Sequence, residues 1–405
     1  MCALALQHAE HSDVPLPHPS LRVLEVDFRT DRRWKEFISC HPDALIYHHP
    51  GWLSALENEF GQKCIGLACE DDRGSLKAIL PLIYTRGLPL KFGRIATGRR
   101  LCSLPRTPVA GPLALNQEAA VAIVEHAVER ARSENVQLEI KTSIGNLDQS
   151  IENLSCMPWR ATYVEELPPV TEGEPWERFW ETLRVPRPCI SCEGCRKLRF
   201  GNARRQHRIN WSVNKAIRMG LSVREAETED ELHQWYGLYL LTMREIAVPP
   251  RPYRLFRSLW YSLRPSRNML LLLAIQGRSG QERTVAGSIF LQYSQTVFYA
   301  FTGCAPKDFH LHPHDILQLE AIRAACRSGF RWYDFGEVAE ENDTLAQFKT
   351  KWGGDPMPLF RYYDPAPVEG RSKSAGKITA SARRIWRSLP PKATEVLGDL
   401  IYRRM

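Results

Sequence analysis

The stretch AIQGRSGQERTVAGSIFL (274–291) contains an apolar run, a polar turn with two glycines, and a second apolar run. This order predicts a β-hairpin, because two apolar strand-forming runs joined by a glycine-containing turn pair as antiparallel strands. The stretch ACEDDRGSLKAILPL (68–82) has the same order, although Pro81 predicts an edge or a bulge in its second strand. We interpret the two hairpins as equivalent parts of an internal duplication.

The same elements surround both hairpins. Apolar periodicity predicts helices at 51–60, 118–133, 253–263 and 315–326, and strands at 64–70, 76–84, 136–140, 269–275, 284–293, 296–303 and 332–335. Each half then reads as helix, hairpin, helix and strand, which predicts an α/β fold with mixed sheets. A further helix, at about 203–219 and ended by Gly220, lies between the halves.

These patterns divide the 405 residues into five parts. We expect a flexible N-terminus (1–20), a first domain (21–185), a cysteine-containing basic linker (186–220), a second domain (221–368) and a basic amphipathic tail (369–405). No long uncharged apolar run and no basic start to an apolar leader are present, so we expect a cytoplasmic protein. The 11 scattered cysteines fit reduced thiols in that compartment.

The net charge of +8 is concentrated in two segments. Residues 371–405 contain nine basic and two acidic residues, and residues 196–219 contain eight basic residues and no acidic one. The remainder of the chain is acidic, so the pattern indicates local contact with polyanions rather than a uniformly basic protein.

Several motifs together resemble one known family. They are YHHPGWLSALENEFG (47–61), NKAIRMGL (214–221), WYGLYLLTMREIAVPP (235–250), TVAGSIF (284–290), RWYDFGE (331–337) and FKTKWGG (348–354). In this order the chain resembles the FemABX-like proteins, including the FemAB-related acyltransferases of exopolysaccharide systems. The resemblance implies a tandem duplication of the GNAT acyltransferase fold, joined here by the basic linker helix.

The resemblance also implies an N-acyltransferase that moves an acyl or aminoacyl group to an amine acceptor, in cell-envelope or exopolysaccharide biosynthesis. The donor would be aminoacyl-tRNA or acyl-CoA. Two alternatives stay open: an acyl-CoA-dependent N-acyltransferase of small-metabolite biosynthesis, and a non-catalytic tRNA- or complex-binding protein on a degenerate GNAT scaffold.

Two departures from the family pattern bear on the donor. The segment CAPKDFHLHPHDIL (304–317) has no glycine where GNAT enzymes wrap a CoA pyrophosphate, although glycine permits close backbone approach to phosphate. Glu337 follows the DFG sequence, where relatives often have a basic residue.

Acyl transfer needs a base for the attacking amine and a donor for the oxyanion. Asp334 and Glu337 are candidate bases or acceptor ligands, with turn capping or ion pairing as the alternative. Lys349 could contact a phosphate or the acyl carbonyl, and Tyr299 could donate to the oxyanion or pack in the core. Candidate donor and acceptor contacts, each with a structural alternative, are His312, His314, Asp315, Trp352, Gly353, Tyr47, His49 and Trp52.

Two features of the linker suggest further ligands. Its helix offers Arg204, Arg205, Arg208, Lys215 and Arg218 to a polyanion such as tRNA, or simply to solvent. The sequence CISCEGC (189–195) places Cys189, Cys192 and Cys195 at metal-ligand spacing. With His207 as a fourth ligand they would bind zinc, and with a fourth thiolate such as Cys156 they would bind zinc or an iron–sulfur cluster. The alternative is that the segment contains only free thiols.

The tail predicts two short helices separated by Pro390 and Pro391. Apolar residues share one side of each helix, among them Ile385, Val396 and Leu400. This pattern suits peripheral contact with an anionic inner-membrane surface, or docking on the protein itself or a partner. The sequence leaves the oligomeric state open.

Overall fold

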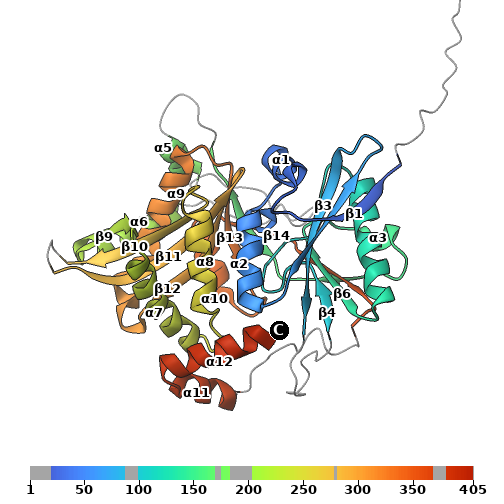
Figure 1. Cartoon of the computed structure of the whole chain (residues 1–405). Helices are drawn as coiled ribbons and strands as arrows, with labels where there is room; N and C mark the ends of the chain where they lie inside the picture. The colour runs from blue at the N-terminus through green and yellow to red at the C-terminus, as the bar shows by residue number, and fades with distance from the viewer. Residues whose placement is uncertain are drawn as a thin grey trace, which may run out of the picture.

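The computed structural model describes residues 20–86, 99–168, 175–182, 203–277, 281–367 and 380–404. Two mixed β-sheets lie side by side, with helices packed on their faces and between them (Figure 1). The predicted α/β class is therefore confirmed.

The first sheet has the strand order β1-β2-β3-β4-β6-β15-β7, with β5 paired to β3. Strands β1 to β4 are antiparallel, and β6 then pairs with β4 in parallel after a helical crossover. The strands are β1 (Arg22–Val26), β2 (Cys64–Glu70), β3 (Leu76–Thr85), β4 (Arg100–Cys102), β5 (Leu113–Ala114), β6 (Gln137–Thr142), β7 (Ser155–Pro158) and β15 (Phe360–Asp364). The helices of this half are α1 (Arg32–Cys40), the 3-10 helix η1 (Ile46–His48), α2 (Pro50–Phe60), α3 (Gln117–Ser133) and α4 (Leu147–Ser150).

The second sheet has the order β14-β8-β13-β12-β11-β10-β9. Its strands are β8 (Thr162–Glu166), β9 (Leu221–Glu225), β10 (Met269–Gln276), β11 (Arg283–Tyr293), β12 (Thr296–Cys304), β13 (Trp332–Glu337) and β14 (Asp355–Met357). The helices of this half are α5 (Pro175–Thr182), α6 (Ala203–Arg218), α7 (Glu229–Glu245), α8 (Tyr253–Leu263), the 3-10 helix η2 (Pro306–Leu311), α9 (Pro313–Arg327) and α10 (Asp343–Lys351).

The two sheets repeat one topology. In the second, β9 to β12 are antiparallel, α9 crosses over, and β13 pairs with β12 in parallel. Helices α7 and α8 lie between β9 and β10 in sequence, as α1 and α2 lie between β1 and β2. The predicted duplication is therefore confirmed at the level of strand order.

Each sheet is completed by a strand from the other half of the chain. Strand β15, which follows the second half in sequence, inserts between β6 and β7 of the first sheet. Strand β8, which precedes the basic linker, inserts between β13 and β14 of the second sheet. This exchange ties the two halves together through backbone hydrogen bonds.

Strand β3 lies inside the sheet, but at Pro81 it has a partner strand on one side only, so the expected edge is present locally within an interior strand. Strand β3 pairs with β2 on one side, and on its other side with β5 through Ile79 and with β4 from Ile83 onwards. Proline lacks the N–H that a ladder uses. Pro81 is tolerated in an interior strand because it falls between these two short partners, and the bulge of this hairpin lies at Cys69/Glu70 instead.

The halves meet at helices α2 and α8, which are equivalent in the repeat and pack on each other (Figure 1). One hydrophobic core runs through this contact and includes Trp52, Leu56, Phe256 and Trp260. Within it, the Arg251 guanidinium donates to both carboxylate oxygens of Glu59, at 2.7 and 2.5 Å. Both side chains are buried, so the interface contains a charge pair shielded from water.

The tail forms the two predicted helices, α11 (Ala380–Ser388) and α12 (Pro391–Arg404). They lie against α7 and α2 at one end of the molecule (Figure 1). Within the described ranges, no helix combines the length and apolarity that crossing a bilayer requires.

Candidate active site

The second sheet opens at its centre, where its two parallel strands separate. The pairing of β12 with β13 ends at Phe298 and Asp334, although β12 continues to Cys304 and β13 to Glu337. A bulge at Ala300 interrupts the pairing of β12 with β11, since Phe290 pairs with Tyr299 and Ile289 with Phe301. Residues 299–302 are half-buried whereas the strand ends are buried, so solvent reaches the sheet here.

Asp334 lies at the point where the strands separate, and its carboxylate is buried. Its Oδ1 accepts hydrogen bonds from the Thr162 hydroxyl on β8, at 2.5 Å, and from the Gly336 backbone N–H, at 2.6 Å. Burial raises the pKa of Asp334 above its ordinary value, against the opposing effect of these two donors and of Lys349. Asp334 thus organises the turn at Gly336, whose φ is +81°.

Lys349 extends from α10 into the same place. Its Nζ donates to the carbonyl oxygens of Gly336, at 2.8 Å, and Glu337, at 3.1 Å. Burial lowers the pKa of Lys349 to about 8, while the carboxylates of Asp334 and Glu337 act in the opposite direction. A protonated amine in this position keeps one N–H for a ligand, because an ammonium carries three.

Glu337 is the more accessible of the two acids, with a half-buried side chain. Its Oε2 accepts from the indole N–H of Trp159 at 2.9 Å, and its Oε1 lies 3.8 Å from an Arg160 nitrogen. The Trp159 ring is itself covered by the Arg361 guanidinium, 3.3 Å from the ring centroid. The carboxylate is therefore held in one orientation while part of it stays open to solvent.

Tyr299 is not brought together with these groups. Its ring stacks on Phe290 in the core beneath α9, at a centroid distance of 5.6 Å. Asp334 is paired with Phe298, on the opposite face of the sheet, because neighbouring residues of a strand face opposite sides. The oxyanion role predicted for the Tyr299 hydroxyl is therefore not supported by its position.

The start of α9 is a compact polar cluster. The Asp315 carboxylate pairs with the Lys351 ammonium and accepts from the Trp352 indole N–H at 3.2 Å, and His312 Nδ1 lies 3.7 Å from it. Burial lowers the pKa of His312. His314 faces Thr302 of β12, with Nδ1 3.3 Å from the hydroxyl, and burial lowers its pKa to about 4.

Trp352 and Gly353 lie beneath the site rather than at its surface. Trp352 is fully buried. Gly353 has φ +103°, and a Cβ there would come within 2.8 Å of the Glu165 carboxylate. These two residues anchor α10 against α9 and β8, which corrects the expectation that they contact substrate directly.

Tyr47 and Trp52 from the first half face the same region. The Tyr47 ring packs on Phe298 of β12 and on Trp52, with both centroid distances 5.1 Å, and burial together with the Asp334 charge raises its pKa. Among the described residues, none accepts a hydrogen bond from the buried Trp52 indole N–H. His49 instead caps α2, since its Nδ1 accepts from the Gly51 N–H at 3.0 Å.

Helix α6 presents part of its basic set near the start of α9. Arg208 and Arg218 are exposed, and the side chains of Arg204 and Arg205 lie outside the described residues. The Lys215 ammonium lies 5.1 Å from the ring centroid of Trp211, and that ring contacts His312 edge-on at 5.1 Å. Trp211 is 49% exposed, which is unusual for so large a ring.

Three further residues of the site, Trp211, Trp159 and Thr162, were not predicted from the sequence. Trp211 could have been identified from the sequence, because a large aromatic residue outside the apolar stripe of α6, which contains Ile209 and Val213, is expected to be exposed. The other two reach the site only through the strand exchange.

The predicted metal ligands Cys189, Cys192 and Cys195 lie outside the described residues, and His207 is exposed on α6. The described part of the chain contains no cluster of three or more potential metal ligands. The zinc site therefore remains a prediction.

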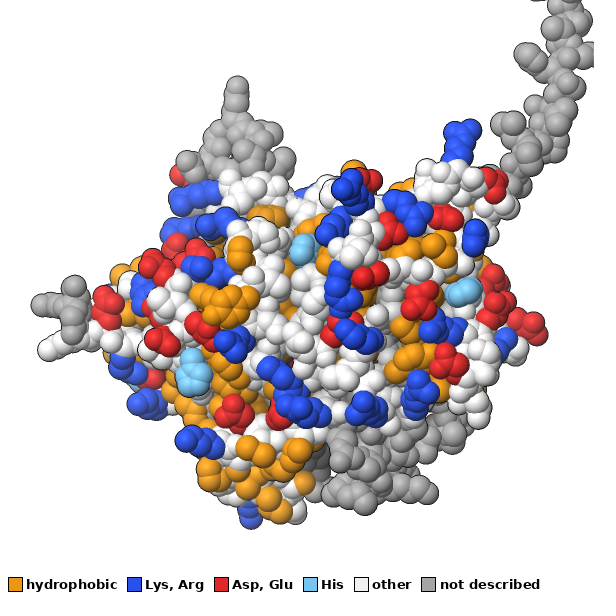
Figure 2. Space-filling model, viewed as in Figure 1, with side chains coloured by type: hydrophobic (Ala, Val, Ile, Leu, Met, Phe, Trp, Pro, Cys, Tyr) orange, Lys and Arg blue, Asp and Glu red, His pale blue; other side chains and the backbone are white. Residues whose placement is uncertain are grey.

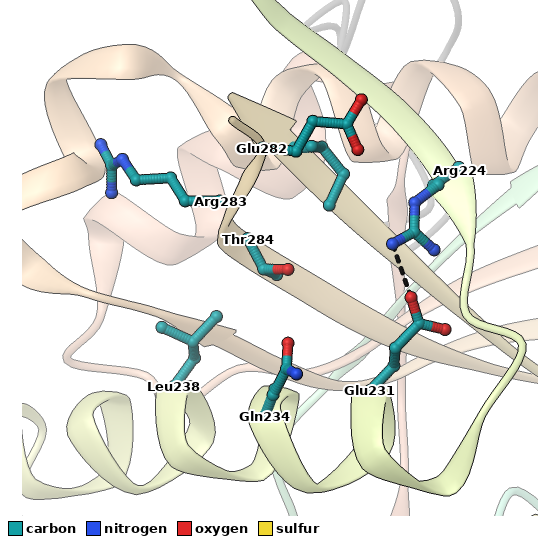
Figure 3. Close-up of a pocket in the computed structure, with 8 residues that line it drawn as sticks. Arg224, Glu231, Gln234, Leu238, Glu282, Arg283 and Thr284 are labelled. Carbon is teal, nitrogen blue, oxygen red and sulfur yellow. Dashed lines mark ion pairs between the residues drawn. The ribbon is translucent and has the colours of Figure 1, made fainter. Parts of the chain in front are cut away.

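A separate pocket of about 470 Å³ lies at the outer edge of the second sheet, between α7 and strands β9 to β11 (Figure 3). Arg224 and Glu231 form an ion pair across it. Arg283, the other arginine of its lining, donates to both carboxylate oxygens of Asp308 at 2.9 Å. Both arginines already have carboxylate partners, so neither offers a free positive charge to an anionic ligand.

Comparison with known proteins agrees with the geometry. Residues 202–350 match the family described as "Acetyltransferase (GNAT) domain". The crystal structure of FemX superposes with a TM-score of 0.59 and 12% identity, covering 84% of this chain and 96% of FemX. The C-terminal domain of a putative lysylphosphatidylglycerol synthetase from Agrobacterium fabrum has a TM-score of 0.49 and 12% identity, covering 84% of this chain and 92% of that one. No curated protein sequence matches the chain.

The FemX superposition spans both halves, and the GNAT match covers most of the second half, where the strands separate. At this identity the likeness to FemX establishes the fold. Residues 202–350 thus match a GNAT acetyltransferase domain, and the chain as a whole has the fold of FemX.

Proposed function

We propose that this protein is an N-acyltransferase that moves an aminoacyl group from aminoacyl-tRNA to an amine acceptor. The observation that carries the proposal is the buried Lys349 amine beside Asp334 and Glu337, at the point where β12 and β13 separate. An amine held there can donate a hydrogen bond to a carbonyl oxygen as that oxygen gains negative charge.

The reaction follows from these positions. The acceptor amine attacks the carbonyl carbon of the donor, and the proton on the attacking nitrogen passes to Glu337, the accessible carboxylate. An N–H of Lys349 stabilises the tetrahedral oxyanion. Collapse of the intermediate breaks the ester bond, and the leaving ribose oxygen takes up a proton from the protonated Glu337. Asp334 acts as a positioning residue, because it holds the turn whose carbonyls bind Lys349.

The start of α9 favours aminoacyl-tRNA over acyl-CoA. Pro313 has no N–H, and the N–H of Asp315 is bonded to the His312 carbonyl at 3.2 Å. The Asp315 carboxylate occupies the first turn, where a pyrophosphate would otherwise bind to the helix N-terminus. A ring such as Trp211, flanked by Lys215, instead suits stacking of a nucleobase beside phosphates.

The acceptor would enter between the halves, beside Glu337. Tyr47 and Trp52 are buried in the core that the halves share, so they would support this side of the site rather than contact the acceptor. We place the reaction in the cytoplasm and, following the resemblance to FemAB-related enzymes, in the synthesis of a cell-envelope or exopolysaccharide component.

The donor is tested by ligand-induced stabilisation. We expect charged tRNA to raise the melting temperature more than uncharged tRNA does, with an effect that weakens as salt rises, because ligands that bind only the folded state stabilise it. Trp211→Ala should weaken tRNA binding by about tenfold, as expected for the loss of one base stack. Ile217→Ala, which removes another exposed apolar side chain from α6, should not.

Two other outcomes would replace the proposal. Stabilisation by an acyl-CoA and not by tRNA, with no effect of Trp211→Ala, would establish the acyl-CoA-dependent alternative. Absence of a response to either ligand would favour a non-catalytic scaffold.

The two acids are distinguished by isosteric replacement. Glu337→Gln should lower kcat by about 10² or more, because it removes the base but keeps an acceptor for Trp159. Asp334→Asn keeps an oxygen for Thr162 and Gly336, so kcat should fall by about tenfold or less. Steady-state kinetics of both variants would reverse this assignment if Asp334→Asn were the more damaging.

A further inference from the structure

The C-terminal helices present an apolar surface to solvent, and we propose that it binds an anionic lipid bilayer. The C-terminal apolar face consists of Ile385, Val396, Leu397 and Leu400, which are 63%, 59%, 39% and 53% exposed. Figure 2 shows hydrophobic side chains gathered over α11 and α12 at this end of the molecule. The proposal does not depend on the reaction that the protein catalyses.

The contacts of α12 with the body of the protein determine which side of this helix faces solvent. Thr394 and Tyr402 are buried there, and the Tyr402 ring lies 6.0 Å from Phe60 of α2. Gly398 lies so close to Pro250 that a Cβ would come within 2.5 Å of the Pro250 carbonyl oxygen. Because this side is closely packed, Val396, Leu397 and Leu400 point outward. In an ordinary surface helix the apolar residues face the core instead.

Polar contacts hold both helices in this orientation. Asp399 of α12 pairs with Arg254 of α8. On α11, the Arg387 Nε donates to the Glu245 carbonyl at the end of α7, at 2.7 Å. Ile246, the next residue along the chain, is 53% exposed and extends the apolar surface onto the body of the protein. The apolar face is therefore a fixed part of the fold.

The charge around this face selects its partner. Residues 380–404 contain six basic and two acidic residues, and Asp399 is paired with both Arg254 and Arg403. Arg383, Arg384 and Lys392 are exposed beside the apolar side chains. A second copy of the chain would bring these like charges together, whereas an anionic lipid surface complements them. An apolar strip with a basic margin is typical of a helix that lies in a membrane interface.

Vesicle co-sedimentation of the full chain tests the proposal. We expect binding to vesicles of 70% phosphatidylcholine and 30% phosphatidylglycerol, about tenfold stronger than binding to phosphatidylcholine alone, and weaker at high salt. Val396→Asp combined with Leu400→Asp should reduce partitioning by at least about tenfold. Leu115→Asp places the same charge at an exposed leucine outside the tail and should leave binding unchanged.

Arg383→Gln combined with Arg384→Gln tests the charge separately. It should abolish the preference for anionic vesicles, and circular dichroism should show that all variants remain folded. The proposal is overturned if the unaltered protein binds neither vesicle, or if the Val396/Leu400 variant binds as well as the unaltered protein. It is also overturned if the protein self-associates through this face, seen as a sedimentation coefficient that rises with concentration and falls in the Val396/Leu400 variant, without vesicle binding.

Discussion

Replacement of Lys349 by methionine is expected to lower kcat by about 10² to 10³, with little change in the affinity for the donor. The amine lies at the separation of β12 and β13, where it can donate to an oxyanion that forms only during the reaction. Loss of one such preorganised donor typically costs this factor. Single-turnover transfer from charged tRNA, followed as product formation, measures the effect directly.

The pH dependence of the same step gives a second test. The pKa of Lys349 is lowered to about 8 by burial, so the amine is mostly protonated at pH 7 and loses its charge as the pH rises through about 8. We therefore expect the rate to fall above about pH 8, and this limb to be absent from the residual activity of Lys349→Met.

The lowered pKa of Lys349 also determines how the stability of the protein changes with pH. Between about pH 8 and the ordinary lysine value of 10.5, the unfolded chain binds more protons at this residue than the folded one. The contribution of Lys349 to the free energy of unfolding should therefore increase with pH across that window. Gln347→Ala, at an exposed position of the same helix, is the matched control for both experiments. An unchanged rate in Lys349→Met would remove Lys349 from the mechanism.

Replacement of Glu59 by leucine should destabilise the protein by about 3–5 kcal/mol. The change leaves the Arg251 guanidinium buried between α2 and α8 without its carboxylate, and an uncompensated buried charge has a cost of this size. The arginine cannot respond by losing its proton, because a guanidinium stays protonated in proteins even when it is buried. Chemical denaturation gives the free energy of unfolding.

Two controls separate the buried charge from a general loss of packing. Glu59→Leu combined with Arg251→Met removes both charges and should recover most of the lost stability. Glu166→Gln breaks an exposed ion pair with Arg331 and should change stability by about 1 kcal/mol or less. If the double variant were no more stable than Glu59→Leu, the destabilisation would come from packing rather than from the unpaired charge.

Much of this protein could be predicted from its sequence, because local patterns determine local structure. The apolar spacing in 253–263 predicts α8 with the bounds that the structure has. The paired hairpins predict the duplication, because each apolar run needs a partner strand to bury its face. The RWYDFGE and FKTKWGG motifs (331–337 and 348–354) identify Asp334, Glu337 and Lys349, which the structure brings together.

The remaining features depend on contacts between segments that are far apart in sequence. Glu59 and Arg251 are 192 residues apart, and Trp159 reaches Glu337 across 178 residues. The exchange of β8 and β15, the tolerance of Pro81 in an interior strand and the outward apolar face of α12 all depend on which elements become neighbours. Periodicity along a chain specifies which side of an element is buried. Only tertiary packing decides which surface that side is buried against. Because of this packing, Trp352 is buried against α9, and Tyr299 lies on the face of the sheet away from Asp334.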